Sequence, residues 1–470
     1  MTTLIKGGTV VNATGVTRAD VVIEGKRIAA VIAPDSDLAA TVERGGPDIV
    51  DATDRLVIPG GVDVHVHLQL PMTPNATSSD TFETGTQAAA WGGTTTIIDF
   101  AGQMQGMGAR EAVDERLAEA DGQCAIDYGL HLSMGDVNPT SLKEMRGLVD
   151  EGITSFKYFM AYPGTWYSDD GQLLRAMQVA NDTGAMVMMH AENGIAIDVL
   201  RDQAAAKGQT DPVFHGHTRP SRLEGEATHR AIALASIAGA PLYIVHLSAA
   251  ESLEQVVLAR DRGENVFAET CPQYLYLSLE EHLDRPGLQG ARHICSPPLR
   301  PRSEGHQDTL WAGLRTDDLS VVSTDHCPFC DAEKMQGIDD FRNVPNGLGS
   351  IEHRMDLLHQ GVVTGEISLA RWVDVCSTTP ARLFGLAGQK GAIAPGADAD
   401  IVIYDPTVQH RLGVDSHHMQ MDNSVWEATP VLGQAQSVMS RGSWVIENRR
   451  FVGHRGHGRY LRRSIAEPLR

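Results

Sequence analysis

Short runs of apolar and β-branched residues recur through the middle of the chain, and a longer stretch with helical spacing of apolar positions follows most of them. A nearly continuous apolar run is typical of a parallel strand that is covered on both faces. The runs are GVDVHVH (61–67), TTTIIDFA (94–101), YGLHLS (128–133), ITSFKYFMA (153–161), AMVMMHAE (185–192), PLYIVHLS (241–248), NVFAETC (265–271) and LSVVSTDH (319–326). Eight strands that alternate with helices predict a (β/α)8 TIM barrel, an α/β fold.

Both ends of the chain have a different pattern, in which short strand-like runs are separated by Gly, Asn and Asp. This pattern predicts β structure without long helices. We expect one small β-sandwich domain built from residues 1–57 and 396–448, and a barrel over residues 58–395. The remaining residues, 449–470, form an Arg-rich tail, which we expect to dock on its own subunit or on a neighbouring one.

The composition is that of an ordinary globular protein. Of 470 residues, 42% are hydrophobic and 21% are charged, and no apolar run approaches the roughly 18 residues of a membrane span. The net charge of −21 argues against nucleic acid and membranes as partners, because phosphate binding needs clustered Lys and Arg. The first residues lack a signal-peptide pattern, and the six cysteines are scattered, so we expect a cytoplasmic protein.

Potential metal ligands lie at corresponding positions of several predicted strands. His65 and His67 are two positions apart in the first strand, so both side chains project from one face. Alone, this pair is weak evidence for a metal. Four later runs each end near a residue of the same kind: Lys157, His190, His246 and Asp325. Because the carboxyl ends of all barrel strands open on one face, we expect the six side chains to converge on a metal centre.

Lys157 is the unusual member of this set, because a protonated lysine cannot bind a metal. Its neutral amine can react with carbon dioxide to form a carbamate (N6-carboxylysine), whose two oxygens can bridge two cations. Imidazole and oxygen ligands favour two Zn(II) ions per subunit, with Mn(II), Co(II) or Fe(II) as the other candidates.

Ten sequence blocks, spread over essentially the whole chain, extend this pattern. They are DVHVHLQLP, FETGTQAAAWGGTTTIIDF, FKYFMAY, MHAENG, GEATHRAIALA, YIVHLS, CSPPLR, STDHCPF, VPNG and KGAIAPGADADIVIYDP. The set resembles the cyclic amidohydrolases, specifically the dihydropyrimidinase and D-hydantoinase group. Because several blocks are long, the resemblance is far more specific than the histidine spacing alone.

The resemblance implies a role for each candidate residue. One zinc is held by His65, His67 and Asp325, the other by His190 and His246, and carboxylated Lys157 bridges both. Asp325 also serves as the catalytic base, and Tyr162 donates a hydrogen bond to the developing oxyanion. Ser296 and Asn346 grip the substrate, largely through backbone groups. The implied reaction, in which a metal-bridging hydroxide opens dihydropyrimidines and 5-substituted hydantoins to N-carbamoyl amino acids, belongs to pyrimidine catabolism, and the implied assembly is a homotetramer.

Several features bear on the identity of the cyclic amide. Gln69 stands where dihydroorotases usually carry an arginine for the substrate carboxylate, which favours a neutral ring. Trp166 and Tyr167 are candidates for an apolar wall beside a bulky ring substituent. A second H-x-H pair, His215 and His217, follows a polar loop, and we interpret it as structural.

Three alternatives remain open at this point. Allantoinase has a similar metal centre and a hydantoin substrate. A metal-free scaffold protein of the same fold is the non-enzymatic alternative, although the chain keeps all six ligands. A mononuclear deaminase also uses H-x-H, later histidines and an aspartate, and Lys157 distinguishes the dinuclear site from it.

Overall fold

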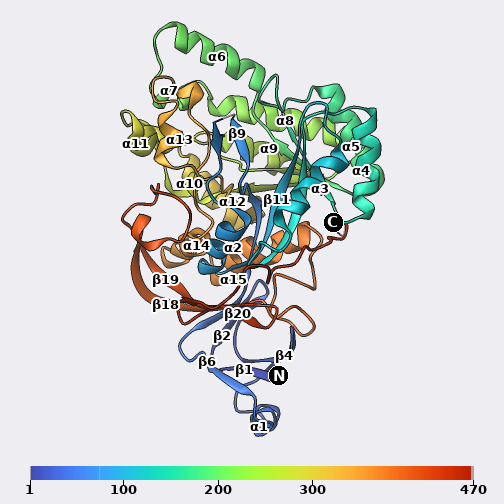
Figure 1. Cartoon of the computed structure of the whole chain (residues 1–470), viewed down its shortest axis with the longest axis vertical. Coiled ribbons are helices and arrows are strands. Elements are labelled where there is room, and N and C mark those ends of the chain that lie inside the picture. The colour runs from blue at the N-terminus through green and yellow to red at the C-terminus, as the bar shows by residue number, and fades with distance from the viewer. Residues whose placement is uncertain (1, 74, 467–470) are drawn as a thin grey trace.

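The computed structural model describes residues 2–73 and 75–466, and its centre is a barrel of parallel strands (Figure 1). Eight strands follow one another in chain order around the sheet. They are β8 (Gly61–Val66), β11 (Thr94–Gln103), β12 (Asp127–Met134), β13 (Ser155–Phe159), β14 (Met186–His190), β15 (Leu242–Ile244), β16 (Val266–Thr270) and β17 (Val321–Val322). The eight strands expected from the apolar runs are all present, and the (β/α)8 barrel is confirmed.

Helices cover the outside of the barrel. The longer ones are α2 (Phe82–Trp91), α3 (Ala109–Ala120), α4 (Pro139–Asp150), α5 (Asp170–Thr183), α6 (Gly194–Ala206), α8 (Ser221–Ala238), α9 (Ala250–Asp261), α12 (His306–Thr316) and α14 (Arg354–Val363). Helix α1 (Asp37–Arg44) lies apart from the barrel, beside the small sheets at the lower end of Figure 1. The other shorter helices are α7 (Val213–His217), α10 (Pro272–Tyr276), α11 (Leu288–Ala291), α13 (Asp331–Met335), α15 (Leu369–Val373) and α16 (Thr379–Leu383). Their starts follow local chemistry: Asn138 caps α4 by accepting from two backbone N–H groups, and Pro139 occupies the first turn.

Two further sheets lie beside the barrel, at the lower end of Figure 1. One has the order β5 (Arg27–Ile32), β4 (Asp20–Glu24), β1 (Thr2–Lys6) and β6 (Asp48–Asp51). The other joins both chain ends in the order β21 (Arg450–Phe451), β20 (Ser443–Glu447), β19 (Thr429–Ser440), β18 (Ile401–Leu412), β7 (Leu56–Pro59), β2 (Thr9–Asn12) and β3 (Gly15–Arg18). The two chain ends therefore meet in β structure. The domain limits expected above stay predictions.

Where its first and last strands meet, the barrel is closed by side chains and by one backbone bridge, in which the His67 N–H donates to the His326 carbonyl at 2.8 Å. Among the described residues, no ladder pairs β8 with β17. Instead, Arg354 Nη1 donates to the Val62 and Val322 carbonyls at 3.0 and 2.9 Å. Asp63 accepts from the Thr324 N–H at 3.2 Å and its hydroxyl at 2.7 Å. These bonds connect the strand that carries His65 to the segment that carries Asp325.

The described part of the Arg-rich tail docks on its own barrel. The Tyr128 N–H donates to the Arg459 carbonyl at 3.0 Å, and the Leu461 N–H donates to the Tyr128 carbonyl at 2.7 Å. Arg463 is buried and donates to the Ser155 hydroxyl at 2.9 Å. Residues 467–470 of the predicted tail lie outside the described residues. Nowhere in the described chain is a helix both long and apolar enough to cross a membrane.

Candidate metal centre and active site

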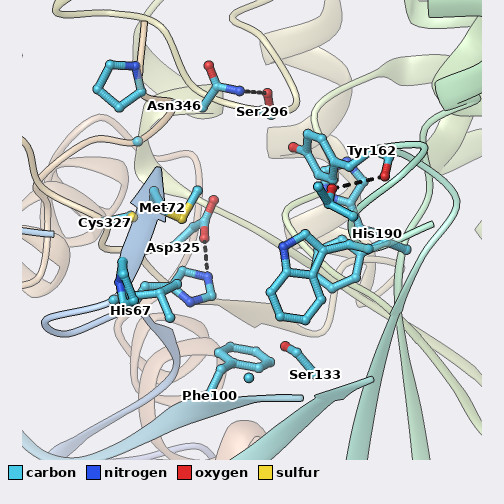
Figure 2. A pocket seen from close by; sticks show the side chains of 18 of the residues that line it. His67, Met72, Phe100, Ser133, Tyr162, His190, Ser296, Asp325, Cys327 and Asn346 are labelled. Carbon is cyan, nitrogen blue, oxygen red and sulfur yellow. Dashed lines mark hydrogen bonds and ion pairs between the residues drawn. The ribbon is translucent and has the colours of Figure 1, made fainter. Parts of the chain in front are cut away.

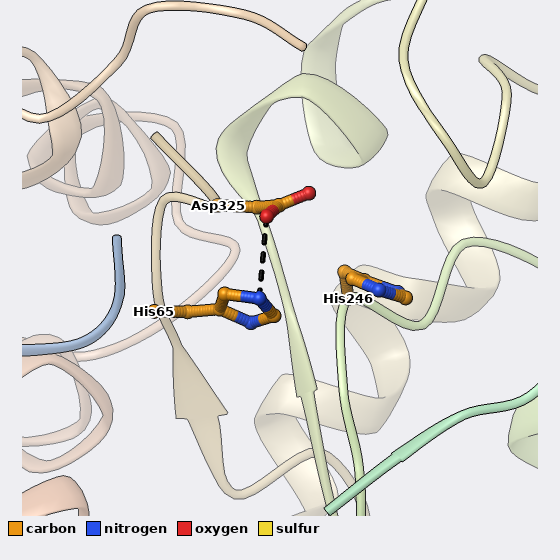
Figure 3. A group of neighbouring side chains, drawn as sticks. All are labelled: His65, His246 and Asp325. Carbon is orange, nitrogen blue, oxygen red and sulfur yellow. Dashed lines mark ion pairs between the residues drawn. The ribbon is translucent and has the colours of Figure 1, made fainter. Parts of the chain in front are cut away.

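The barrel brings the six candidate ligands together at the carboxyl ends of its strands. His65 lies in β8 and His67 directly follows it, Lys157 lies in β13, and His190 is the last residue of β14. His246 and Asp325 lie just beyond β15 and β17. Figure 3 shows His65, His246 and Asp325 approaching from separate segments, and one ligand atom from each lies within 4.8 Å of the others.

One group of ligand atoms converges on Asp325. Its Oδ1 lies 3.2 Å from His65 Nε2 and 3.2 Å from His67 Nε2, and Figure 2 shows the contact with His67. Lys157 Nζ lies 2.9 Å from His65 Nε2. Burial works to raise the pKa of Asp325, but the histidines, with His65 first, hold it well below its usual range. Asp325 is therefore a carboxylate.

Glu269, in β16, determines which nitrogen of His65 faces the centre. This buried carboxylate contacts His65 Nδ1, and it accepts from the Tyr243 hydroxyl at 2.8 Å and from the His246 N–H at 3.1 Å. Burial raises the pKa of Glu269 against the opposing effect of these donors, to a net value of about 7, and the charged form accepts a hydrogen bond from the Nδ1–H of His65. The Nε2 lone pair of His65 then faces the Asp325 carboxylate. The repulsion between this lone pair and the carboxylate is offset by a positive charge beside them, from the Lys157 ammonium 2.9 Å from Nε2 or from a metal cation.

A second group is built from His190 and His246. His190 Nδ1 lies 2.9 Å from His246 Nε2, while His190 Nε2 lies 2.8 Å from Glu192 Oε2. Burial lowers the pKa of His246 well below its ordinary value, so its ring is neutral. Glu192 orients His190 in the same way as Glu269 orients His65, and it is itself paired with Arg219 at 3.1 Å.

Three of the candidate residues have a left-handed backbone conformation. The φ angles are 39° at His246, 51° at Asp325 and 63° at Tyr162. For residues other than glycine, this conformation costs on the order of 1 kcal/mol or more, and it is concentrated at functional sites. The fold therefore tolerates local strain at the positions where these side chains turn toward the centre.

The centre opens into a cavity of about 1020 Å³. His67, Lys157, His190, His246 and Asp325 line it, whereas His65 lies behind them with no exposed surface. Each arginine that lines the cavity already has an acidic partner: Arg201 pairs with Asp198, Arg219 with Glu192, and Arg342 with Asp340 and Asp202. The cavity thus offers no unpaired arginine for a substrate carboxylate among the described residues.

The candidate substrate residues lie on the walls of this cavity. Figure 2 shows Ser296 and Asn346 on one side, joined by a bond of 3.1 Å from Asn346 Nδ2 to Ser296 Oγ, and Tyr162 beside His190. The Tyr162 and His190 rings are 5.2 Å apart. Burial raises the pKa of Tyr162 to about 12, so the phenol keeps its proton and can donate a hydrogen bond.

Trp166 also lines the cavity, but Tyr167 does not. The indole packs against Gly102 and Gly135, where a Cβ atom would lie 3.3 and 3.2 Å from the ring. Its ring is 5.3 Å from that of Phe159. Tyr167 instead forms a backbone bridge with Phe159. The apolar wall expected from both aromatic residues therefore contains only Trp166.

Two other sequence interpretations can be compared with the structure. Gln69 does not line the cavity; its Oε1 accepts from the Phe82 N–H at 3.2 Å, at the start of α2. His215 and His217 lie in α7, where His215 is buried and donates to the Cys295 carbonyl at 2.8 Å, while His217 is exposed. The structure gives this pair no shared ligand.

Sequence reasoning missed Asp63, Glu192, Arg219 and Glu269. The only available signal was a charged residue inside an apolar strand run, as in VFAET for Glu269 and GVDVHV for Asp63. A buried charge is rare without a partner, so such a residue could have been selected as a candidate neighbour of a ligand. Its partner could not have been named.

Comparison with known proteins identifies the family. Residues 56–445 match the amidohydrolase family. The chain belongs to this family. It is similar to a D-hydantoinase of Streptomyces coelicolor, with 54% identity over 99% of both chains, and to one of Geobacillus stearothermophilus, with 44% identity over 99% of this chain and 97% of that protein.

Solved structures agree with this assignment. A dihydropyrimidinase from Brevibacillus agri superposes with a TM-score of 0.95 and 46% identity, covering 99% of this chain and all of that chain. An L-hydantoinase from Arthrobacter aurescens superposes with a TM-score of 0.87 and 28% identity, covering 98% of this chain and 99% of that chain. The resemblance to the dihydropyrimidinase and D-hydantoinase group is confirmed.

Proposed function

We propose that the protein hydrolyses cyclic amides, namely dihydropyrimidines and 5-substituted hydantoins, to N-carbamoyl amino acids. The observation that carries this proposal is the convergence of Lys157, Asp325 and four imidazoles at the base of one cavity, with ring nitrogens of the histidines within 3.2 Å of one another, of the lysine or of the carboxylate. The relatives named above are hydantoinases and a dihydropyrimidinase, which supports the same chemistry.

The donor set fits two divalent cations. His65, His67 and Asp325 would hold one and His190 and His246 the other, with Lys157 as a carbamate between them. Lys157 suits this role because no described carboxylate lies within ion-pair distance of its amine, which contacts His65 Nε2 instead. Zn(II) is the metal we propose for these nitrogen and oxygen ligands. Bound cations would polarise the ring carbonyl and make a water molecule more acidic.

Proton transfer, stabilisation of the oxyanion and positioning of the ring would be carried out by side chains and backbone groups of the protein. Asp325 would take a proton from the attacking water as its oxygen bonds to the ring carbonyl carbon. Tyr162, protonated and at the cavity wall, would donate a hydrogen bond to the carbonyl oxygen as negative charge develops there. When the ring C–N bond breaks, Asp325 would return the proton to the departing nitrogen. Ser296 and Asn346 would hold the ring at the opposite side of the cavity.

A neutral ring fits the cavity better than an anionic one. All three lining arginines are paired with acidic residues, and Gln69 is engaged with the start of α2. A substrate carboxylate would therefore have to displace an existing ion pair. We infer that dihydroorotate is a poor substrate.

The test is the hydrolysis rate of zinc-loaded protein on dihydrouracil, hydantoin, phenylhydantoin, allantoin and dihydroorotate. We expect fast opening of the first three and little reaction with the last two. Preference for allantoin would make the protein an allantoinase, and preference for dihydroorotate would contradict the argument from paired arginines. Inactivity on the whole panel with bound zinc would refute the proposal and favour the scaffold or deaminase alternative.

Trp166 offers a test of substituent preference. Replacing it with Ala removes the apolar wall, so we expect the rate ratio of phenylhydantoin to unsubstituted hydantoin to fall by about tenfold, the effect of a few buried carbons. Tyr167→Ala is the matched control, because Tyr167 does not line the cavity. An unchanged ratio for Trp166→Ala would exclude Trp166 from substituent recognition.

The homotetramer is a further proposal, and it rests on the resemblance to the group. Light scattering of the purified protein tests it, because a tetramer has four times the 50.7 kDa of one chain.

A further inference from the structure

Lys334, in α13, is a buried lysine outside the candidate metal centre. Only 1% of its surface is exposed. Its Nζ donates to three backbone carbonyls, those of Ile294 at 3.0 Å, Pro345 at 2.8 Å and Gly347 at 2.9 Å. An ammonium group has three N–H donors, so all three are used. Among the described residues, no carboxylate lies within ion-pair distance of it.

The three carbonyls belong to the two loops that carry the candidate substrate residues. Ile294 precedes Ser296 by two residues, and Pro345 and Gly347 lie on either side of Asn346. The loops also contact each other directly, because the Gly347 N–H donates to the Ile294 carbonyl at 3.0 Å. Lys334 is thus the point at which one side chain holds both loops.

The backbone groups of Ser296 and Asn346 are left without partners in the protein. Within the described parts of the chain, neither the N–H nor the C=O of these two residues forms a hydrogen bond, although both residues line the cavity. The carbonyls of neighbouring residues, in contrast, accept hydrogen bonds: those of Ile294, Pro345 and Gly347 from Lys334, and that of Cys295 from His215 at 2.8 Å. The backbone N–H and C=O groups of Ser296 and Asn346 are thus available to a ligand, while the residues beside them are fixed by hydrogen bonds. A preorganised binding site has this arrangement.

We propose that Lys334 is a positioning residue for substrate binding. It holds the two loops at the separation at which the backbone groups of Ser296 and Asn346 grip the N–H and C=O groups of a cyclic amide. This inference rests on the proposed function and adds to it a residue that touches neither metal nor substrate.

The charge on Lys334 makes the arrangement sensitive to pH. Burial lowers the pKa of Lys334 to about 7. The titratable groups that face it are the thiols of Cys295 and Cys327 and the His293 imidazole. Burial raises the pKa of Cys295 to about 12 and that of Cys327 further, and it lowers the pKa of His293 to about 4, so all three are neutral near pH 7. Deprotonated Lys334 has only two N–H groups, so one of the three carbonyls loses its hydrogen bond and the two loops are held less firmly.

The first experiment replaces Lys334 with Met, which fills similar space without donors. The control is Lys207→Met, at an exposed lysine. For zinc-loaded protein and dihydrouracil, we expect KM to rise by about tenfold or more, since misplaced binding groups lose most of their contribution. We expect kcat to stay within about threefold, and zinc content and the melting temperature to match the control. An unchanged KM, or a loss confined to kcat, would overturn the proposal.

A second measurement needs no variant and so does not depend on whether Lys334→Met folds. KM for dihydrouracil, whose ring does not ionise in this range, is measured on the unaltered enzyme from pH 6 to pH 9. We expect KM to rise several-fold as pH passes about 7, the pKa of Lys334. A flat KM over this range would contradict the role of the ammonium.

Hydrogen exchange separates this proposal from the proposed function. The Gly347 amide should exchange faster in Lys334→Met than in Lys207→Met, whether or not the protein hydrolyses any cyclic amide. Absence of hydrolysis by the unaltered enzyme would refute the proposed function alone. Unchanged exchange at Gly347 would refute only the proposal that Lys334 holds the two loops in place.

Discussion

Lys157 and Lys390 are both buried, with 2% and 3% of their surfaces exposed, but they lie in opposite surroundings at the two ends of the barrel. At the amino ends of the strands, Lys390 Nζ lies 2.6 Å from Asp127, 3.0 Å from Asp398 and 2.8 Å from Asp400. Burial works to lower the pKa of Lys390, but these carboxylates raise it overall. At the carboxyl ends, Lys157 has no such partner among the described residues, and burial lowers its pKa to about 8.

The difference shows that buried charges serve fold stability at one end of the barrel and ligand binding at the other. At the amino ends, Arg441 pairs with Asp127 at 2.9 Å and Arg27 pairs with Asp398 at 3.0 Å, so the three carboxylates face three cations of the same chain. Such a network stabilises the fold only while it is complete. At the carboxyl ends, an amine without a carboxylate and ring nitrogens of His190 and His246 only 2.9 Å apart form a set of potential ligands that a bound cation would complete.

The largest expected effect comes from removing the uncompensated lysine. Lys157→Ala should lose the bound zinc and reduce the hydrolysis rate by about a thousandfold or more, because the metals supply several kcal/mol of transition-state stabilisation. Added acetate or propionate should restore part of both. Zinc content by atomic absorption and the initial rate are the measurements, with exposed Lys143→Ala as control. Full zinc and activity in Lys157→Ala would refute the dinuclear site.

Removing the compensated lysine should affect stability instead. Lys390→Met leaves the three carboxylates without their ammonium, so the free energy of unfolding should fall by about 3–5 kcal/mol. Chemical denaturation followed by circular dichroism measures this change. The folded variant should still bind as much zinc per subunit as the unaltered protein. Loss of zinc without loss of stability would show that the two ends of the barrel do not divide these tasks.

A smaller effect is expected at Glu269, which orients His65. Glu269→Gln keeps the shape but removes the charge that favours a proton on His65 Nδ1, and substitutions of this kind typically weaken metal binding by about 10–100-fold. Competition with a chelator measures the affinity, and Glu254→Gln at an exposed position of α9 is the control. Equal affinities would mean that the barrel wall alone fixes the orientation of His65.

The smallest effect concerns alkaline pH. Because the folded-state pKa of Lys390 is raised above its ordinary value of 10.5, its stabilising contribution is complete below about pH 10 and is lost as pH rises through the folded-state pKa. The difference in melting temperature between the unaltered protein and Lys390→Met should therefore be constant from pH 7 to pH 10 and then shrink. A difference that grows above pH 10 would contradict the sign of this shift.

Much of the fold was predictable because the relevant signals are local. Each of the eight apolar runs coincides with a barrel strand, although β11 and β12 extend one or two residues beyond theirs, since a parallel strand covered on both faces must be apolar along its length. The positions of His190, His246 and Asp325 at or just beyond strand ends were equally local. The contribution of Tyr167 was predicted wrongly, because the direction of a side chain in an irregular loop depends on the surface beneath it; here two glycines make room for Trp166 instead.

The residues that hold the ligands could not be predicted, because their partners lie far away in the chain. Glu269 contacts His65 across 204 positions, and Asp63 holds Thr324 across 261. No local pattern connects such pairs, and a buried acidic residue has the same sequence context whether its partner is a histidine, a backbone amide or an arginine. The same holds for Lys334, whose three acceptors are backbone carbonyls that carry no sequence signal.

The sequence by itself determined the strand and helix order, the types of the candidate ligands and the end of the barrel on which they meet. These properties depend on periodicity and chain order, which can be recognised from residues that are adjacent in sequence. Only the tertiary structure decided which nitrogen of each histidine faces the centre, which buried lysine lacks a carboxylate, and which backbone groups remain free in the cavity. Those properties depend on distances between groups that are remote in sequence, and electrostatic and hydrogen-bond energies are set by such distances.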